Sequence, residues 1–162
     1  YNCPDANTNG GEDFCGGKTH LAYADTEVEY APGRFLLSPR DVAKLLQGLA
    51  PRAGERALAI AAPYAAAVLR QIGLSVDEAA ADAQVGQGGY DLVIAEGAVA
   101  EVPAAWIAAL ADGGRLGVIE RQGPVGKAKV VVRTEDGAGA RVIFDASPPF
   151  LLGHEPKAAF AF

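Results

Sequence analysis

A strand that runs directly into a helix constrains the fold of this chain more than any other feature. The stretch ERALAIAAPYAAAVLRQIG contains an apolar strand at Ala57–Ile60, a tight corner at Ala61, Ala62 and Pro63, and a helix that Gly73 ends. Such a unit is typical of sheets whose parallel strands are connected by helices. These folds bind ligands at the carboxyl ends of their strands, which makes the corner a candidate site. The corner contains no glycine, although a backbone that closely approaches a ligand usually needs one.

The pattern of the remaining chain extends this unit into an α/β sheet with an antiparallel edge. A helix is expected to begin at Ser38, whose hydroxyl suits the N-cap, and 90–97 has the continuous apolar pattern of a strand covered on both faces. The other expected elements are a short strand at 73–76, a weak helix at 77–84, a helix over 103–112 with Trp106 and Leu110 inward, a strand at 115–120, and a hairpin of strands at 128–134 and 140–145.

The chain falls into two regions of different amino-acid composition. Residues 1–19 are rich in Gly, Asn and Asp and are predicted to form a loop segment. Residues 20–162 are predicted to form one α/β domain. The net charge of −6 argues against nucleic acid as a partner, and no apolar run reaches the roughly 18 residues that a membrane span requires. The apolar end AAFAF, at 158–162, is a candidate surface for docking on an unidentified protein partner.

The N-terminal segment contains a candidate calcium loop. Its pattern D-x-N-x-N-G-x-x-D matches the first nine positions of an EF-hand-like loop, in which oxygen ligands alternate along the chain. Thrombospondin type 3 calcium repeats are similar over residues 3–15. Position twelve is Gly16 instead of a bidentate glutamate, so a solvated loop is the alternative. The candidate ligands are Asp5, Asn7, Asn9, Gly11 and Asp13.

The two cysteines provide evidence about the cellular compartment of the protein. The body of the chain has the composition of a cytoplasmic protein, but a disulfide between Cys3 and Cys15 would indicate export. Because the chain begins at Tyr1 and contains no methionine, we also expect that a segment upstream has been processed, deleted or left out.

From Leu21 to Phe162 the chain resembles the protein-L-isoaspartate O-methyltransferase family. The quoted segments LAYADTEVEYAPGRFLLSPRDVAKLL, APRAGERALAI and YDLVIAEGAVAEVPAAWIAALADGGRLGVIE follow the family pattern in order, and the final hairpin and PPFLLG follow its ending. The resemblance implies a trimmed, Rossmann-like, S-adenosylmethionine-dependent methyltransferase fold with a C-terminal antiparallel hairpin. It also implies methyl transfer from S-adenosylmethionine to isoaspartyl carboxyl groups.

The departures from the family pattern fall on the cofactor site. Family members carry an acid near the end of the first strand and then a G-x-G-x-G turn, whereas this chain has Ala59 and the alanine-proline corner. Members also place an acid after the second strand to hold the ribose, for which Asp77 or Glu78 is a candidate remnant. Glu96 and Gly97 stand at the end of the apolar segment over 90–97 and are candidates for the same remnant pocket. A simple loop acid is the alternative for Glu96.

The substrate segment departs as well. In the family it reads G-Q-T-x-S-Q-P, and the matching residues place Phe35 and Leu37 where the hydroxyl side chains stand. Methyl transfer depends on holding the nucleophilic oxygen in line with the methyl group, which these side chains cannot do.

Two functions remain open at this stage. The first is a degenerate, non-catalytic relative of the methyltransferases that has lost its cofactor and acts as a binding or structural protein. The alternative is an active S-adenosylmethionine-dependent protein-L-isoaspartate O-methyltransferase. We interpret the corner as a former cofactor site that has been filled in. A cavity beside Ala61 would favour the enzyme, and a corner plugged by Pro63 and Tyr64 would favour the non-catalytic protein.

Overall fold

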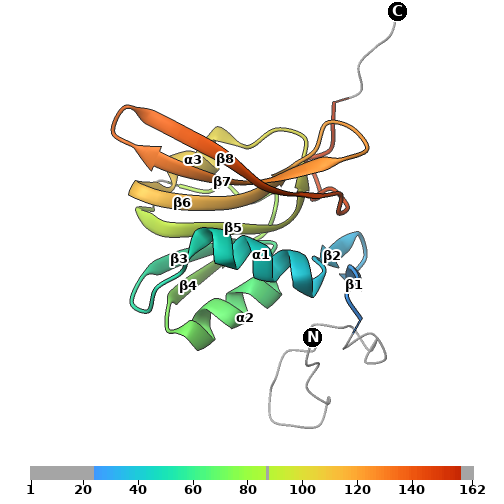
Figure 1. Ribbon diagram of the computed structural model, residues 1–162, viewed down its shortest axis with the longest axis horizontal. Helices are drawn as coiled ribbons and strands as arrows, with labels where there is room; N and C mark the ends of the chain where they lie inside the picture. The colour runs from blue at the N-terminus through green and yellow to red at the C-terminus, as the bar shows by residue number, and fades with distance from the viewer. Residues whose placement is uncertain (1–23, 87, 158–162) are drawn as a thin grey trace, which may run out of the picture.

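A computed structural model describes residues 24–86 and 88–157 (Figure 1). Its main feature is a six-stranded sheet of order β4-β3-β5-β6-β7-β8, accompanied by a separate two-stranded sheet of β1 and β2. The elements are β1 (Val28–Ala31), β2 (Arg34–Leu36), α1 (Pro39–Leu49), β3 (Arg56–Ile60), α2 (Pro63–Ile72), β4 (Ser75–Ala79), β5 (Tyr90–Val99), α3 (Ala104–Ala108), β6 (Leu110–Glu120), β7 (Gly126–Thr134) and β8 (Gly137–Ala146).

The sheet combines a parallel core with an antiparallel edge, as the sequence predicts. Strands β4, β3, β5 and β6 are parallel, whereas β7 and β8 form an antiparallel hairpin on β6. Parallel neighbours need a crossover, and α2 supplies it between β3 and β4. No helix in the described part of the chain is long and apolar enough to span a bilayer.

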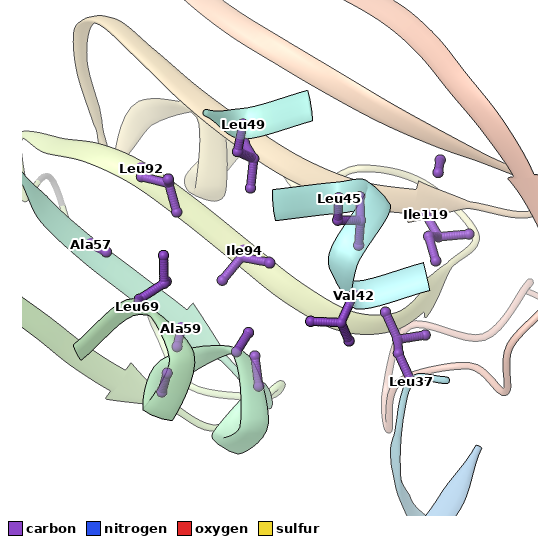
Figure 2. Packing of buried hydrophobic residues seen from close by; sticks show 14 of the residues in the cluster. Leu37, Val42, Leu45, Leu49, Ala57, Ala59, Leu69, Leu92, Ile94 and Ile119 are labelled. Carbon is purple, nitrogen blue, oxygen red and sulfur yellow. The ribbon is translucent and has the colours of Figure 1, made fainter. Parts of the chain in front are cut away.

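Helices α1 and α2 pack on one face of the sheet. Figure 2 shows Leu45 of α1 and Leu69 of α2 over Ala59 of β3 and Ile94 of β5. Successive side chains of a strand point to opposite faces. The alternate residues therefore form a second core on the other face, around Trp106 of α3. Both faces of the central strands are buried, which explains their continuous apolar runs.

The predicted helix boundaries are confirmed around the corner. Helix α1 follows Ser38, whose Oγ accepts the Asp41 N–H at 3.4 Å. Helix α2 ends at Gly73, which adopts the left-handed conformation at φ 103° and satisfies the last carbonyl groups.

Two other expectations are corrected, and one element was missed. The weak helix predicted over 77–84 does not form, because β4 extends to Ala79 by pairing with β3 and turns follow. The helix predicted over 103–112 ends after Ala108, and Leu110 instead begins β6 opposite Tyr90. The β1–β2 hairpin was not predicted. Its turn contains a Pro-Gly pair, with Gly33 at φ 67°.

Candidate functional site

A cavity of about 390 Å³ lies at the carboxyl ends of β3 and β4. This is the edge at which open α/β sheets bind ligands, and the volume falls in the range of small-molecule sites. The β1–β2 hairpin and the segment after β8 complete its walls. The lining residues are Tyr30, Gly33, Arg34, Phe35, Ala59, Ala61, Ala62, Pro63, Glu78, Ala79, Ala80, Ala81, Asp82, Glu96, Pro149, Phe150, Leu151 and Leu152.

The corner between β3 and α2 is open to this cavity. Ala61, Ala62 and Pro63 all line it, so the expectation of a filled corner is wrong. Ala61 has a φ of 47°, a left-handed conformation that usually favours glycine, and its N–H donates to the Ala79 carbonyl at 2.8 Å. This bond fixes the corner against the end of β4.

Glu96 of β5 occupies the N-terminus of α2. Its side chain accepts the Ala65 N–H at 2.6 Å on Oε1 and the Leu37 N–H at 3.3 Å on Oε2, and also accepts from the Tyr64 backbone. The residue is 1% exposed. Ala62 gives α2 no side-chain cap, and Pro63 has no N–H to donate. Glu96 therefore supplies the acceptor for the free donors of the first turn, as an N-cap side chain would.

Burial dominates the electrostatics of Glu96. Removal from water raises the pKa of its carboxyl group to about 7, although the three backbone N–H groups favour the charged form and act in the opposite direction. The group is therefore partly protonated near neutral pH.

Stability is expected to fall as the pH rises from about 4.5 to about 7, through Glu96. Because its pKa is raised from 4.5 to about 7 in the folded state, the folded state holds the proton more tightly. This stabilisation, on the order of 3 kcal/mol, is full below pH 4.5 and lost as the pH passes 7. Urea unfolding of the wild type and Glu96→Gln across this range measures it. An identical pH slope in the two proteins would contradict the role of Glu96.

Unlike Glu96, Gly97 does not line the cavity. It lies instead against the segment after β8. A Cβ atom at Gly97 would approach the Leu151 side chain to 2.6 Å, and Leu151 donates its N–H to the Ala98 carbonyl. Gly97 therefore permits the C-terminal segment to pack closely on β5, a structural role that differs from the proposed cofactor contact.

The pleat of β4 separates the two candidate ribose acids. Glu78 lines the cavity and forms an ion pair with Arg70 of α2 at 2.7 Å. Asp77 is absent from the lining and binds Arg56 at 2.8 Å and the Tyr90 hydroxyl at 2.8 Å. Between these two acids, only Glu78 lies where it can meet a ligand in the cavity.

The residues of the substrate segment also face different surroundings in the structure. Phe35 lines the cavity, whereas Leu37 is buried in the first core and contributes only its N–H, to Glu96. Ser38 caps α1, as the sequence predicts. No hydroxyl side chain of this segment faces the cavity.

The calcium and disulfide hypotheses lie outside the described residues. This holds for Asp5, Asn7, Asn9, Gly11 and Asp13, for Cys3 and Cys15, and for the apolar end at 158–162. Within the described ranges, no three His, Cys, Asp or Glu side chains gather to hold a metal ion.

Sequence reasoning missed the outer wall of the cavity. Tyr30 and Arg34 come from the unpredicted β1–β2 hairpin, and Phe150 and Leu152 come from the segment after the final hairpin. The Pro-Gly turn was the available signal for the first wall. The second wall has no local signal, because Phe150 reaches the cavity through a bridge to Ala98 of β5.

Two solved structures of methyltransferases superpose on this chain. One is described as a protein-L-isoaspartate O-methyltransferase (beta-aspartate methyltransferase) from Plasmodium falciparum in complex with S-adenosyl-L-homocysteine. It is 16% identical, with a TM-score of 0.65 over 81% of this chain and 82% of that chain. The other, a protein-L-isoaspartate O-methyltransferase, is 18% identical, with a TM-score of 0.68 over 84% of this chain and 55% of that chain.

The chain has the methyltransferase fold. At these identities the likeness concerns the fold alone, and the chain spans only about half the length of the second structure. No protein-family model and no curated protein sequence gives a significant match.

Proposed function

We propose that this protein is a non-catalytic member of the methyltransferase fold that binds a small ligand in the cavity beside Ala61. The observation that carries the proposal is the position of the Glu96 carboxyl group. It takes the N–H groups of Tyr64 and Ala65 that a cofactor at the α2 N-terminus would use. The cavity remains open, but its usual anion-binding donors are already bound by the protein itself.

The residues present do not fit S-adenosylmethionine in the manner that the resemblance implies. The glycine-rich turn is replaced by Ala61 and Ala62, whose Cβ atoms hinder a close backbone approach. Pro63 removes one donor. Ala59, at the place of the family acid, lines the cavity as an apolar side chain. We therefore derive no methyl-transfer step for this chain.

An active methyltransferase is the second candidate, and two observations favour it. The cavity beside Ala61 is the feature that we expected of an enzyme, and Glu78 lies at the end of β4, where the resemblance implies a ribose-binding acid. Against it, Phe35 and Leu37 supply no hydroxyl to position an isoaspartyl carboxyl group.

Calorimetric titration with S-adenosylmethionine and S-adenosylhomocysteine separates the two candidates. We expect no heat of binding at millimolar ligand from protein shown by circular dichroism to be folded, and no methylation of an isoaspartyl peptide. Micromolar binding that Glu78→Gln weakens and Asp77→Asn leaves unchanged, together with methyl transfer, would overturn the non-catalytic proposal. Asp77 is a matched control because it neighbours Glu78 on β4 but does not line the cavity.

A further inference from the structure

We propose that the cavity recognises a small organic cation of the methylated ammonium class. The inference rests on the proposed function, which makes the cavity the ligand site. It is carried by the combination of carboxyl groups and aromatic side chains in the lining, and by the loss of the anion-binding donors. Carboxylates with aromatic rings form the usual environment for quaternary ammonium groups.

The first step concerns the helix N-terminus. The first turn of a helix attracts anions because its N–H groups point outward along the positive end of the dipole. Glu96 already bonds to the Tyr64 and Ala65 N–H groups. A phosphate or carboxylate in the cavity would therefore find these donors taken and would meet a buried carboxyl group.

The second step concerns the charge of the lining. Glu78, Asp82 and Glu96 are acidic, and Arg34 is the cation among the lining residues. Glu78 also pairs with Arg70 from outside the lining, but both side chains are more than two-fifths exposed, and exposed pairs contribute little. A ligand cation can therefore compete for Glu78.

Tyr30, on the opposite wall, lies close enough to Arg34, Glu96 and Glu78 for their charges to act on its hydroxyl group. Burial raises the pKa of its hydroxyl group and Arg34 opposes this effect, while Glu96 and Glu78 both raise the pKa further. Carboxyl groups from β5 and β4 therefore act together on a side chain of the opposite wall.

The third step concerns the aromatic side chains. Tyr30, Phe35 and Phe150 line the cavity from β1, β2 and the segment after β8. The Arg121 guanidinium, from outside the lining, lies 5.0 Å from the centroid of the Phe150 ring, so one face of this ring already carries a cation of the protein itself. A cavity of about 390 Å³ suits a compact ligand better than a dinucleotide.

Titration with choline and with its uncharged isostere 3,3-dimethylbutan-1-ol tests the inference. The two probes have nearly the same shape and differ by one charge. We expect choline to bind roughly tenfold more tightly, as measured by calorimetry and by NMR shifts of the lining residues. Equal binding of the two probes, or no binding of choline, would overturn the inference.

Two matched pairs of variants assign the contacts. We expect Glu78→Gln to weaken choline binding severalfold and Asp77→Asn to leave it unchanged. Phe35→Leu should weaken it as well, whereas Phe144→Leu should not, because Phe144 lies outside the cavity under Lys44. Choline binding that none of these variants changes would also contradict the inference. Methylation of an isoaspartyl peptide would instead overturn the proposed function, so the two failures are distinguishable.

Discussion

Replacing Glu96 by alanine is expected to lower the free energy of unfolding by about 3 kcal/mol at neutral pH. The change leaves the N–H groups of Leu37, Tyr64 and Ala65 without their acceptor in a buried environment. It also removes the link that Glu96 of β5 makes to two other parts of the molecule. These are the segment before α1, which contains Leu37, and the first turn of α2, which contains the other two donors. The cost is far above the few tenths of a kcal/mol typical of a surface substitution.

Urea unfolding of Glu96→Ala, Glu96→Gln and Glu101→Ala measures the effect. The glutamine keeps one acceptor oxygen and nearly the same volume, so its loss should be smaller. Glu101 is an exposed acid just beyond the same strand and should have little effect. A loss below about 1 kcal/mol for Glu96→Ala would show that water in the cavity satisfies these donors as well as the carboxyl group does.

Trp106→Ala is expected to cost about 4 kcal/mol of stability without changing ligand binding in the cavity. Trp106 is 2% exposed and is the largest side chain of the core that α3 completes. Its ring lies 5.1 Å from the His154 ring, and His154 Nε2 lies 2.8 Å from the Ala81 carbonyl. Its loss therefore removes the main contact of α3 with the sheet.

Thermal and urea unfolding of Trp106→Ala and Ile107→Ala provide the measurement and its control. Ile107 is the next residue of α3 and is only half-buried, so its truncation should cost about 1 kcal/mol. A stable Trp106→Ala protein with a changed affinity for choline would contradict this core role and would point to a ligand contact.

The elements that the sequence predicted share a local cause. Ser38 marks a helix start because its side chain can bond to the backbone, and Gly73 marks a helix end because glycine adopts the left-handed conformation easily. Both roles can therefore be predicted without a structure. The apolar runs of β3 and β5 identify strands covered on both faces. The helix over 77–84 and the end of the helix over 103–112 were predicted wrongly, because pairing with β3 and β5 outweighed the helix preference of the alanines there. Helix α3 confirms the start of the second helix, at Ala104–Ala108.

In the candidate site, too, only the residues with a local sequence signal could be predicted. Its corner was found because the path from strand to helix is continuous in sequence, and Ala61, Ala62 and Pro63 do line the cavity. Glu78 could not be separated from Asp77 until the pairing of β4 with β3 fixed which side chain points to the cavity. The same holds for Glu96 and Gly97, which are adjacent in sequence but face different neighbours.

The sequence by itself determined the parallel core, the antiparallel hairpin and the place of the corner, because each depends on periodicity and on residues with strong local preferences. Only the tertiary structure decided whether the corner is open and which group occupies the N-terminus of α2. Both depend on contacts between segments far apart in the chain, such as Glu96 with Leu37 and Phe150 with Ala98. No local pattern records these contacts, since they result from the packing of the whole sheet.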